Sequence, residues 1–141
     1  MERLIEELAN GNLTEVKVVL ASVVLALAVY QLLLASVAYG KLRTRLLESG
    51  FASWTHRASG DVVLVLAVLI AIACISVYGF DDDSGAHTVF GIAVLAVLAA
   101  KVVAVRVGGV LGRLLPYLGV SLFAAIGGAW LTSAGDFLGV L

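Results

Sequence analysis

The stretch Val62–Phe80, which reads VVLVLAVLIAIACISVYGF, contains no charged residue and decides the fold. A helix rises about 1.5 Å per residue, so this stretch can cross a hydrocarbon core about 30 Å thick. Its apolar residues do not alternate with polar ones, and a membrane barrel needs many more short segments than this chain can hold. We therefore expect a transmembrane helix and not a strand.

Three further apolar stretches of similar length follow the same pattern: Val18–Ala38, Thr88–Val105 and Leu114–Leu131. The chain of 141 residues is 62% hydrophobic, whereas soluble domains average about 45–50%. A domain of this size cannot hide so much apolar surface from water. We expect an all-α fold, a single transmembrane domain over residues 1–141. It would be an integral membrane four-helix antiparallel bundle, with helices at about 16–39, 56–79, 87–106 and 114–132.

The connections between these helices are short and differ in charge. A basic linker at 41–55 has room for a short interfacial helix at 42–47, an acidic turn covers 81–86, and a glycine-bearing turn covers 106–113. Lysine and arginine favour the cytoplasmic side. The first connection holds Lys41, Arg43 and Arg45, and the third holds Arg106 and Arg113. The second holds Asp81, Asp82 and Asp83, which we interpret as a solvated turn. We expect a plasma-membrane protein with both termini outside and the first and third loops cytoplasmic.

Composition excludes several function classes. The net charge is −1 and no basic patch carries interleaved aromatic residues, so nucleic acid is not an expected partner. The single cysteine, Cys74, precludes an intrachain disulfide and is typical of a small core residue. No nucleophile–base pair, phosphate loop or paired-cysteine metal motif is present, which favours an electron-transfer or non-catalytic subunit over an independent enzyme.

Each of the two histidines is followed by a glycine one helical turn later: His56 by Gly60, and His87 by Gly91. Residues at this spacing share a helix face, and a missing side chain lets a neighbouring helix or a flat macrocycle approach. We expect each histidine to open a transmembrane helix. The spacing is also compatible with a histidine that caps a helix or contacts lipid headgroups and binds nothing.

The faces below the two histidines strengthen the macrocycle interpretation. On the His56 helix, the same face continues through the small residues Ala67, Ala71 and Cys74. On the His87 helix, it continues through Val94 and Leu98 and ends near the cation Lys101. A histidine above such a groove is a plausible haem seat. Because the two helices run antiparallel, the histidines lie near opposite membrane faces and cannot ligate one iron. A second ligand would come from the first or fourth helix, from a second copy or from another membrane subunit, and no second histidine is available at the level of either histidine.

Other polar residues within the spans have more ordinary interpretations. Lys101 and Arg106 can extend their side chains to the headgroups, or anchor an anionic group such as a haem propionate or phospholipid. Gln31, the deepest neutral polar residue, is expected to form a hydrogen bond between helices. Ala124 and Gly128 form a small-residue pair suited to close helix packing.

The order of these features resembles part of the two-haem transmembrane b-type cytochromes, which include the ascorbate-dependent electron shuttles. In that family one helix opens with a histidine after a basic segment, as at His56, and the next opens with H-x-x-x-G, as at His87–Gly91. A following leucine-proline-leucine-histidine sequence corresponds here to Leu115–Leu118, where Tyr117 replaces histidine. The motifs H-R-x-x-G at His56–Gly60 and H-x-x-x-G at His87–Gly91, with the terminal stretch Leu131–Asp136, also resemble an uncharacterised family of four-helix membrane proteins of actinobacteria and haloarchaea.

The cytochrome resemblance implies haem b and a set of residues that would bind it: His56, His87, Gly60, Gly91, Tyr117 and Lys101. We therefore expect a small b-type cytochrome-like membrane subunit that passes electrons within a membrane redox complex. The alternative is an accessory subunit without haem that stabilises a larger membrane complex.

Overall fold

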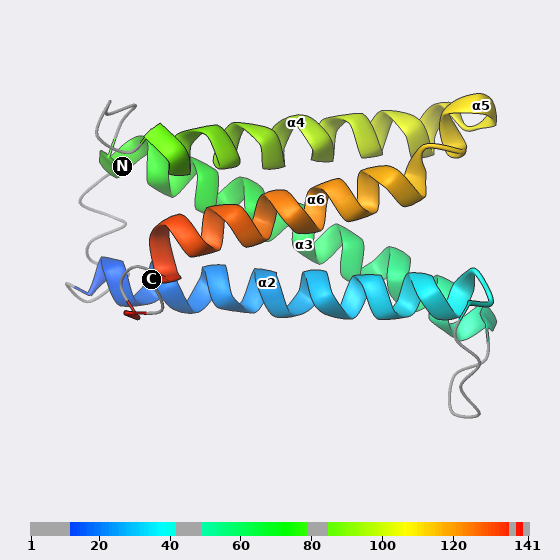
Figure 1. The fold of residues 1–141 in the computed structure, drawn as a ribbon, viewed down its shortest axis with the longest axis horizontal. Coiled ribbons are helices and arrows are strands. Elements are labelled where there is room, and N and C mark those ends of the chain that lie inside the picture. The colour runs from blue at the N-terminus through cyan, green and yellow to red at the C-terminus, as the bar shows by residue number, and fades with distance from the viewer. Residues whose placement is uncertain (1–11, 42–48, 79–84, 136–137, 140–141) are drawn as a thin grey trace.

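The computed structural model describes residues 12–41, 49–78, 85–135 and 138–139, and within them the fold is all-α. Successive long helices run in opposite directions along one bundle (Figure 1), as expected from the short connections. The elements are α2 (Leu13–Ala38), α3 (Ser49–Tyr78), α4 (Gly85–Val107), the short α5 (Gly109–Gly112), α6 (Leu115–Trp130) and the π-helical turn η2 (Leu131–Gly135).

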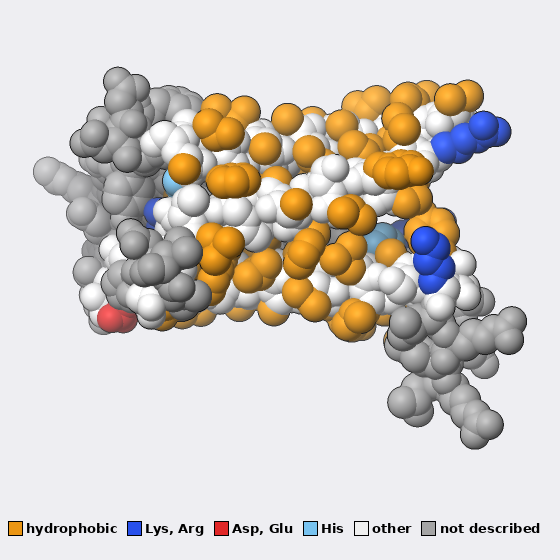
Figure 2. All heavy atoms as spheres, viewed as in Figure 1, with side chains coloured by type: hydrophobic (Ala, Val, Ile, Leu, Met, Phe, Trp, Pro, Cys, Tyr) orange, Lys and Arg blue, Asp and Glu red, His pale blue; other side chains and the backbone are white. Residues whose placement is uncertain are grey.

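Four segments are long and apolar enough to cross a membrane: Thr14–Ala38, Gly50–Ser76, Gly85–Val107 and Leu115–Gly135. Hydrophobic side chains cover the outer face of the bundle along its length, whereas Lys and Arg side chains lie at its ends (Figure 2). Exposed apolar side chains such as Val65 and Leu69, each 56% exposed, match a lipid environment and not water. The chain is a multi-pass membrane protein.

One helix start differs from the sequence expectation. α3 begins at Ser49, about two turns before the expected start at 56, so His56 lies inside the helix and does not open it. The extra turns form because Ala52, which is fully buried, packs with Leu34 and Val37 of α2. The expected interfacial helix at 42–47 and the aspartates at 81–83 lie outside the described residues.

The connection between α4 and α6 and the start of α6 contain glycines and a proline whose backbone conformations explain their path. Gly108 and Gly109 both adopt positive φ angles, of 66° and 57°, which side-chain-bearing residues rarely adopt. Pro116 lies in the first turn of α6, where its missing N–H leaves no intrahelical hydrogen bond unmade. The predicted glycine-bearing turn is confirmed.

The helices pack as two pairs, α2 with α3 and α4 with α6, and α2 joins the pairs through α6. α3 and α4 follow one another in the chain but contact each other much less. The main core includes Val24, Val63, Val94, Leu98 and Leu122. The loose α3–α4 contact leaves space on one side of this core.

Candidate functional site

A cavity of about 710 Å³ lies at the end of the bundle where α4 begins. Cofactor and ligand sites in proteins usually enclose about 300–1,000 Å³. Every long helix contributes to the wall, and most of the lining is apolar. The residues with polar side-chain atoms are Thr14, Lys17, Cys74, His87, Thr88, Trp130, Thr132 and Ser133.

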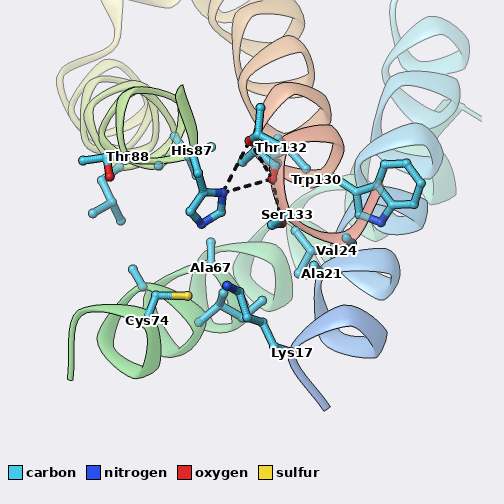
Figure 3. A pocket seen from close by; sticks show the side chains of 18 of the residues that line it. Lys17, Ala21, Val24, Ala67, Cys74, His87, Thr88, Trp130, Thr132 and Ser133 are labelled. Carbon is cyan, nitrogen blue, oxygen red and sulfur yellow. Dashed lines mark hydrogen bonds between the residues drawn. The ribbon is translucent and has the colours of Figure 1, made fainter. Parts of the chain in front are cut away.

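His87 is part-buried on the wall of this cavity and is held from α6 (Figure 3). Its Nδ1 atom lies 3.2 Å from the carbonyl oxygen of Ala129 and 3.4 Å from Oγ1 of Thr132. The prediction that His87 opens its helix is confirmed, because α4 begins at Gly85. The first turn of α4 therefore directs the imidazole between α6 and the cavity.

Small side chains keep the space beside His87 open. Gly91 lines the cavity, and a Cβ atom added there would meet nothing within 4 Å. The facing wall carries Ala67, Ala71 and Cys74 of α3, the small residues singled out from the sequence. The small-residue face of α3 and the His87 face of α4 thus line a single cavity.

Six polar residues of the cavity were not assigned to a site from the sequence: Thr14, Lys17, Thr88, Trp130, Thr132 and Ser133. Lys17 of α2 lines the same cavity as His87 and Cys74. Trp130 donates its indole N–H to Oγ of Ser22 at 3.0 Å, which ties α6 to α2. Lys17 lies near the start of its helix, at the same end of the bundle as His87, and this position could have assigned it to the site from the sequence. No local sequence signal predicts the π-helical turn that carries Thr132 and Ser133.

At the other end of the bundle, His56 has different surroundings. Gln31 of α2 donates its amide to the backbone carbonyl of His56 at 2.8 Å and to Oγ of Ser59 at 2.6 Å, which confirms the predicted bond between helices. A Cβ atom on Gly60 would lie 3.5 Å from the Gln31 amide nitrogen, so the glutamine occupies the groove at this glycine. Nδ1 of His56 is buried and has no hydrogen-bond partner among the described residues.

Lys101 and Tyr117 do not reach the His87 cavity. Lys101 is half-buried on α4 and interacts electrostatically with His56. Tyr117 is 73% exposed on the outside of α6. Among the described residues, no group of three or more His, Cys, Asp or Glu side chains could hold a metal ion.

Residues 5–140 match a family whose description reads "family of unknown function (DUF6529)". The chain belongs to this family. No curated protein and no solved structure matches the chain. In this DUF6529 protein, two of the sequence-predicted residues, His87 and Gly91, share a cavity. His56, Gly60 and Lys101 lie together at the opposite end of the bundle.

Proposed function

We propose that this chain is a small b-type cytochrome-like membrane subunit that holds haem in the cavity beside His87. The observation that carries the proposal is an imidazole on the wall of a mostly apolar cavity of about 710 Å³, with its Nδ1 atom 3.2 Å from a backbone carbonyl oxygen. Histidines that bind metal almost always donate their other ring N–H in this way.

The residues around the cavity fit such a group in three respects. Gly91 and Ala71 leave room for a flat ring beside the imidazole. The positive charge of Lys17, which lines the same cavity as His87, would attract an anionic substituent such as a propionate. Haem bound here would supply one-electron chemistry, with its potential set by the axial ligand and the low polarity of the cavity.

His56 is not expected to complete the same site. His56 lies about two turns after the start of α3 at Ser49, and His87 lies in the first turn of α4, which runs in the opposite direction (Figure 1), so the two histidines lie toward opposite ends of the bundle. No other histidine exists in the chain, so we propose that a second strong nitrogen ligand, where one is used, comes from another membrane subunit or a second copy. The subunit would then pass electrons within a larger redox complex.

Absorption spectra of the purified protein test this function. Protein supplied with haem should show a Soret band and, after dithionite, a reduced α band. His87→Ala should lose both bands, whereas His56→Ala should keep them and serves as the matched control. A colourless wild-type protein would refute the cytochrome proposal and favour the alternative, an accessory subunit that binds no haem. Bands that depend on His56 alone would refute the placement of haem at His87.

We also propose the orientation that the charges favour. The first and third connections, which hold Lys41, Arg106 and Arg113, would face the cytoplasm. The His87 end of the bundle, with both chain termini, would then face outside.

A further inference from the structure

The protonation of His87 follows from the groups around its Nδ1 atom. One neighbour is the Ala129 carbonyl oxygen at 3.2 Å, which can only accept a hydrogen bond. The other is the Thr132 hydroxyl at 3.4 Å. This hydroxyl donates its single proton to the Gly128 carbonyl at 2.8 Å, so it offers only a lone pair to His87. Both neighbours of Nδ1 are therefore acceptors.

A ring nitrogen between two acceptors carries the proton, and in a neutral imidazole the other nitrogen is then bare. In Figure 3 the second nitrogen of His87 points away from α6, toward the space lined by Ala67 and Cys74. The lone pair of Nε2 thus faces the cavity. In this tautomer the histidine can bind a metal centre or accept a hydrogen bond from a ligand.

The partners of Nδ1 come from the end of α6 and the π-helical turn η2 that follows it. Here Thr132 and Ser133 both fold their hydroxyls back onto carbonyls of the preceding turn, and Ser133 donates to the Ala129 carbonyl at 2.8 Å. π-helical turns are rare and occur frequently at functional sites. This turn brings an extra acceptor, Oγ1 of Thr132, to the His87 ring.

We propose that Thr132, together with the Ala129 carbonyl, is a positioning group that holds His87 as the Nδ1–H tautomer and presents Nε2 to the ligand in the cavity. The inference deepens the proposed function and rests on it for the identity of that ligand, a metalloporphyrin. The tautomer itself can be measured in the protein without haem.

The first experiment is nitrogen NMR of the full-length chain in detergent, with ¹⁵N-labelled histidine and no haem. The His87 signals are assigned by their loss in His87→Gln. At a pH where the ring is neutral, we expect Nδ1 to be protonated and Nε2 to be bare. A proton on Nε2 in most molecules would overturn the inference, whether or not the protein binds haem.

Three variants of the same turn separate positioning from general structure. Thr132→Val removes the hydroxyl beside His87 and should lower the ratio of Nδ1–H to Nε2–H about two- to tenfold, as expected for losing one neutral hydrogen bond. Thr132→Ser should restore the ratio. Ser133→Ala removes a hydroxyl that donates to the Ala129 carbonyl, which leaves this carbonyl freer to accept from Nδ1–H, so the ratio should not fall. Equal effects of Thr132→Val and Ser133→Ala would overturn the role of Thr132.

The second experiment compares zinc protoporphyrin with metal-free protoporphyrin, because only the zinc form can accept the Nε2 lone pair. Zinc protoporphyrin should bind more tightly, and Thr132→Val should weaken its binding about tenfold, the lower range for losing a group that orients a metal ligand. If the NMR result holds but neither porphyrin binds, the proposed haem function fails and the tautomer stands. If zinc protoporphyrin binds equally to wild type and Thr132→Val, the positioning role fails and haem binding stands.

Discussion

The ring of Phe90 on α4 lies directly against the backbone of Gly128 on α6, where a Cβ atom would collide with three ring carbons. The sequence pair Ala124 and Gly128 predicted close packing of this helix, and the prediction is confirmed for Gly128, while Ala124 is exposed. Three residues before Phe90, His87 contacts the same segment of α6. The Phe90–Gly128 contact therefore sets how closely α6 approaches the histidine.

Gly128→Ala should destabilise the protein by about 1–3 kcal/mol, because added volume in a packed contact forces side chains or backbone to move. Gly127→Ala is the matched control, since a Cβ at Gly127 meets nothing within 4 Å. It should leave stability unchanged or raise it by up to about 1 kcal/mol through helix propensity. Reversible unfolding in mixed micelles measures both. A Gly128→Ala protein as stable as Gly127→Ala would contradict the contact, and Phe90→Leu should partly rescue Gly128→Ala.

The hydrogen bond between Gln31 and Ser59 should couple α2 to α3. Gln31→Leu and Ser59→Ala, alone and together, form a double-mutant cycle around the 2.6 Å contact. Side-chain hydrogen bonds inside membrane proteins average about 0.6 kcal/mol in such cycles and reach about 1.7 kcal/mol. We expect a coupling within this range by unfolding in mixed micelles. Strict additivity of the two changes would mean that the bond contributes nothing.

Tryptophan fluorescence should report which end of the bundle binds haem. Trp130 lines the His87 cavity, whereas Trp54 is 67% exposed on α3, two residues before His56. The chain has no third tryptophan, so Trp54→Phe and Trp130→Phe each leave a single emitter. Haem added to Trp54→Phe should quench the fluorescence more strongly than haem added to Trp130→Phe. The reverse order would place the haem at the His56 end.

Loss of the indole hydrogen bond between Trp130 and Ser22 should loosen the contact between α6 and α2. Ser22→Ala leaves the indole N–H without its 3.0 Å acceptor and should cost about 0.5–1.5 kcal/mol of unfolding free energy. Ser36→Ala is the control, because the Ser36 hydroxyl bonds only within its own helix, to Leu32. Equal losses in the two variants would argue against a tie between the helices.

Labelling with a membrane-impermeant maleimide tests the proposed orientation. Cys74→Ser removes the single native thiol, and Thr44→Cys or Ser84→Cys then places one thiol in the first or second connection. Intact cells should label Ser84→Cys and should label Thr44→Cys only after lysis, because the lysines and arginines of the first connection favour the cytoplasm. Labelling of both positions from the same side would contradict the four-pass topology itself.

The sequence predicted several residues of the candidate site, but it did not predict which residues of other helices contact them. The H-x-x-x-G spacing correctly grouped His87 with Gly91, because residues one turn apart share a face of any helix. The same spacing occurs at His56 and Gly60, but there the groove beside the glycine is filled by Gln31, a residue of another helix. Local spacing cannot tell these cases apart, since what fills the groove is contributed by a distant segment. The start of α3 was misplaced for a related reason, because Ala52 is held by contacts with α2.

The amino-acid sequence by itself determined four membrane-crossing helices, their alternating directions and the separation of the two histidines to opposite ends. These properties depend on hydropathy and length, which act locally along the chain. Only the tertiary structure decided that α3 and α4 diverge, that a cavity lies beside His87, and that Ala129 and Thr132 bond to its ring. Those features depend on which helix faces meet, and in lipid that choice is made by side-chain packing between distant segments and not by hydropathy.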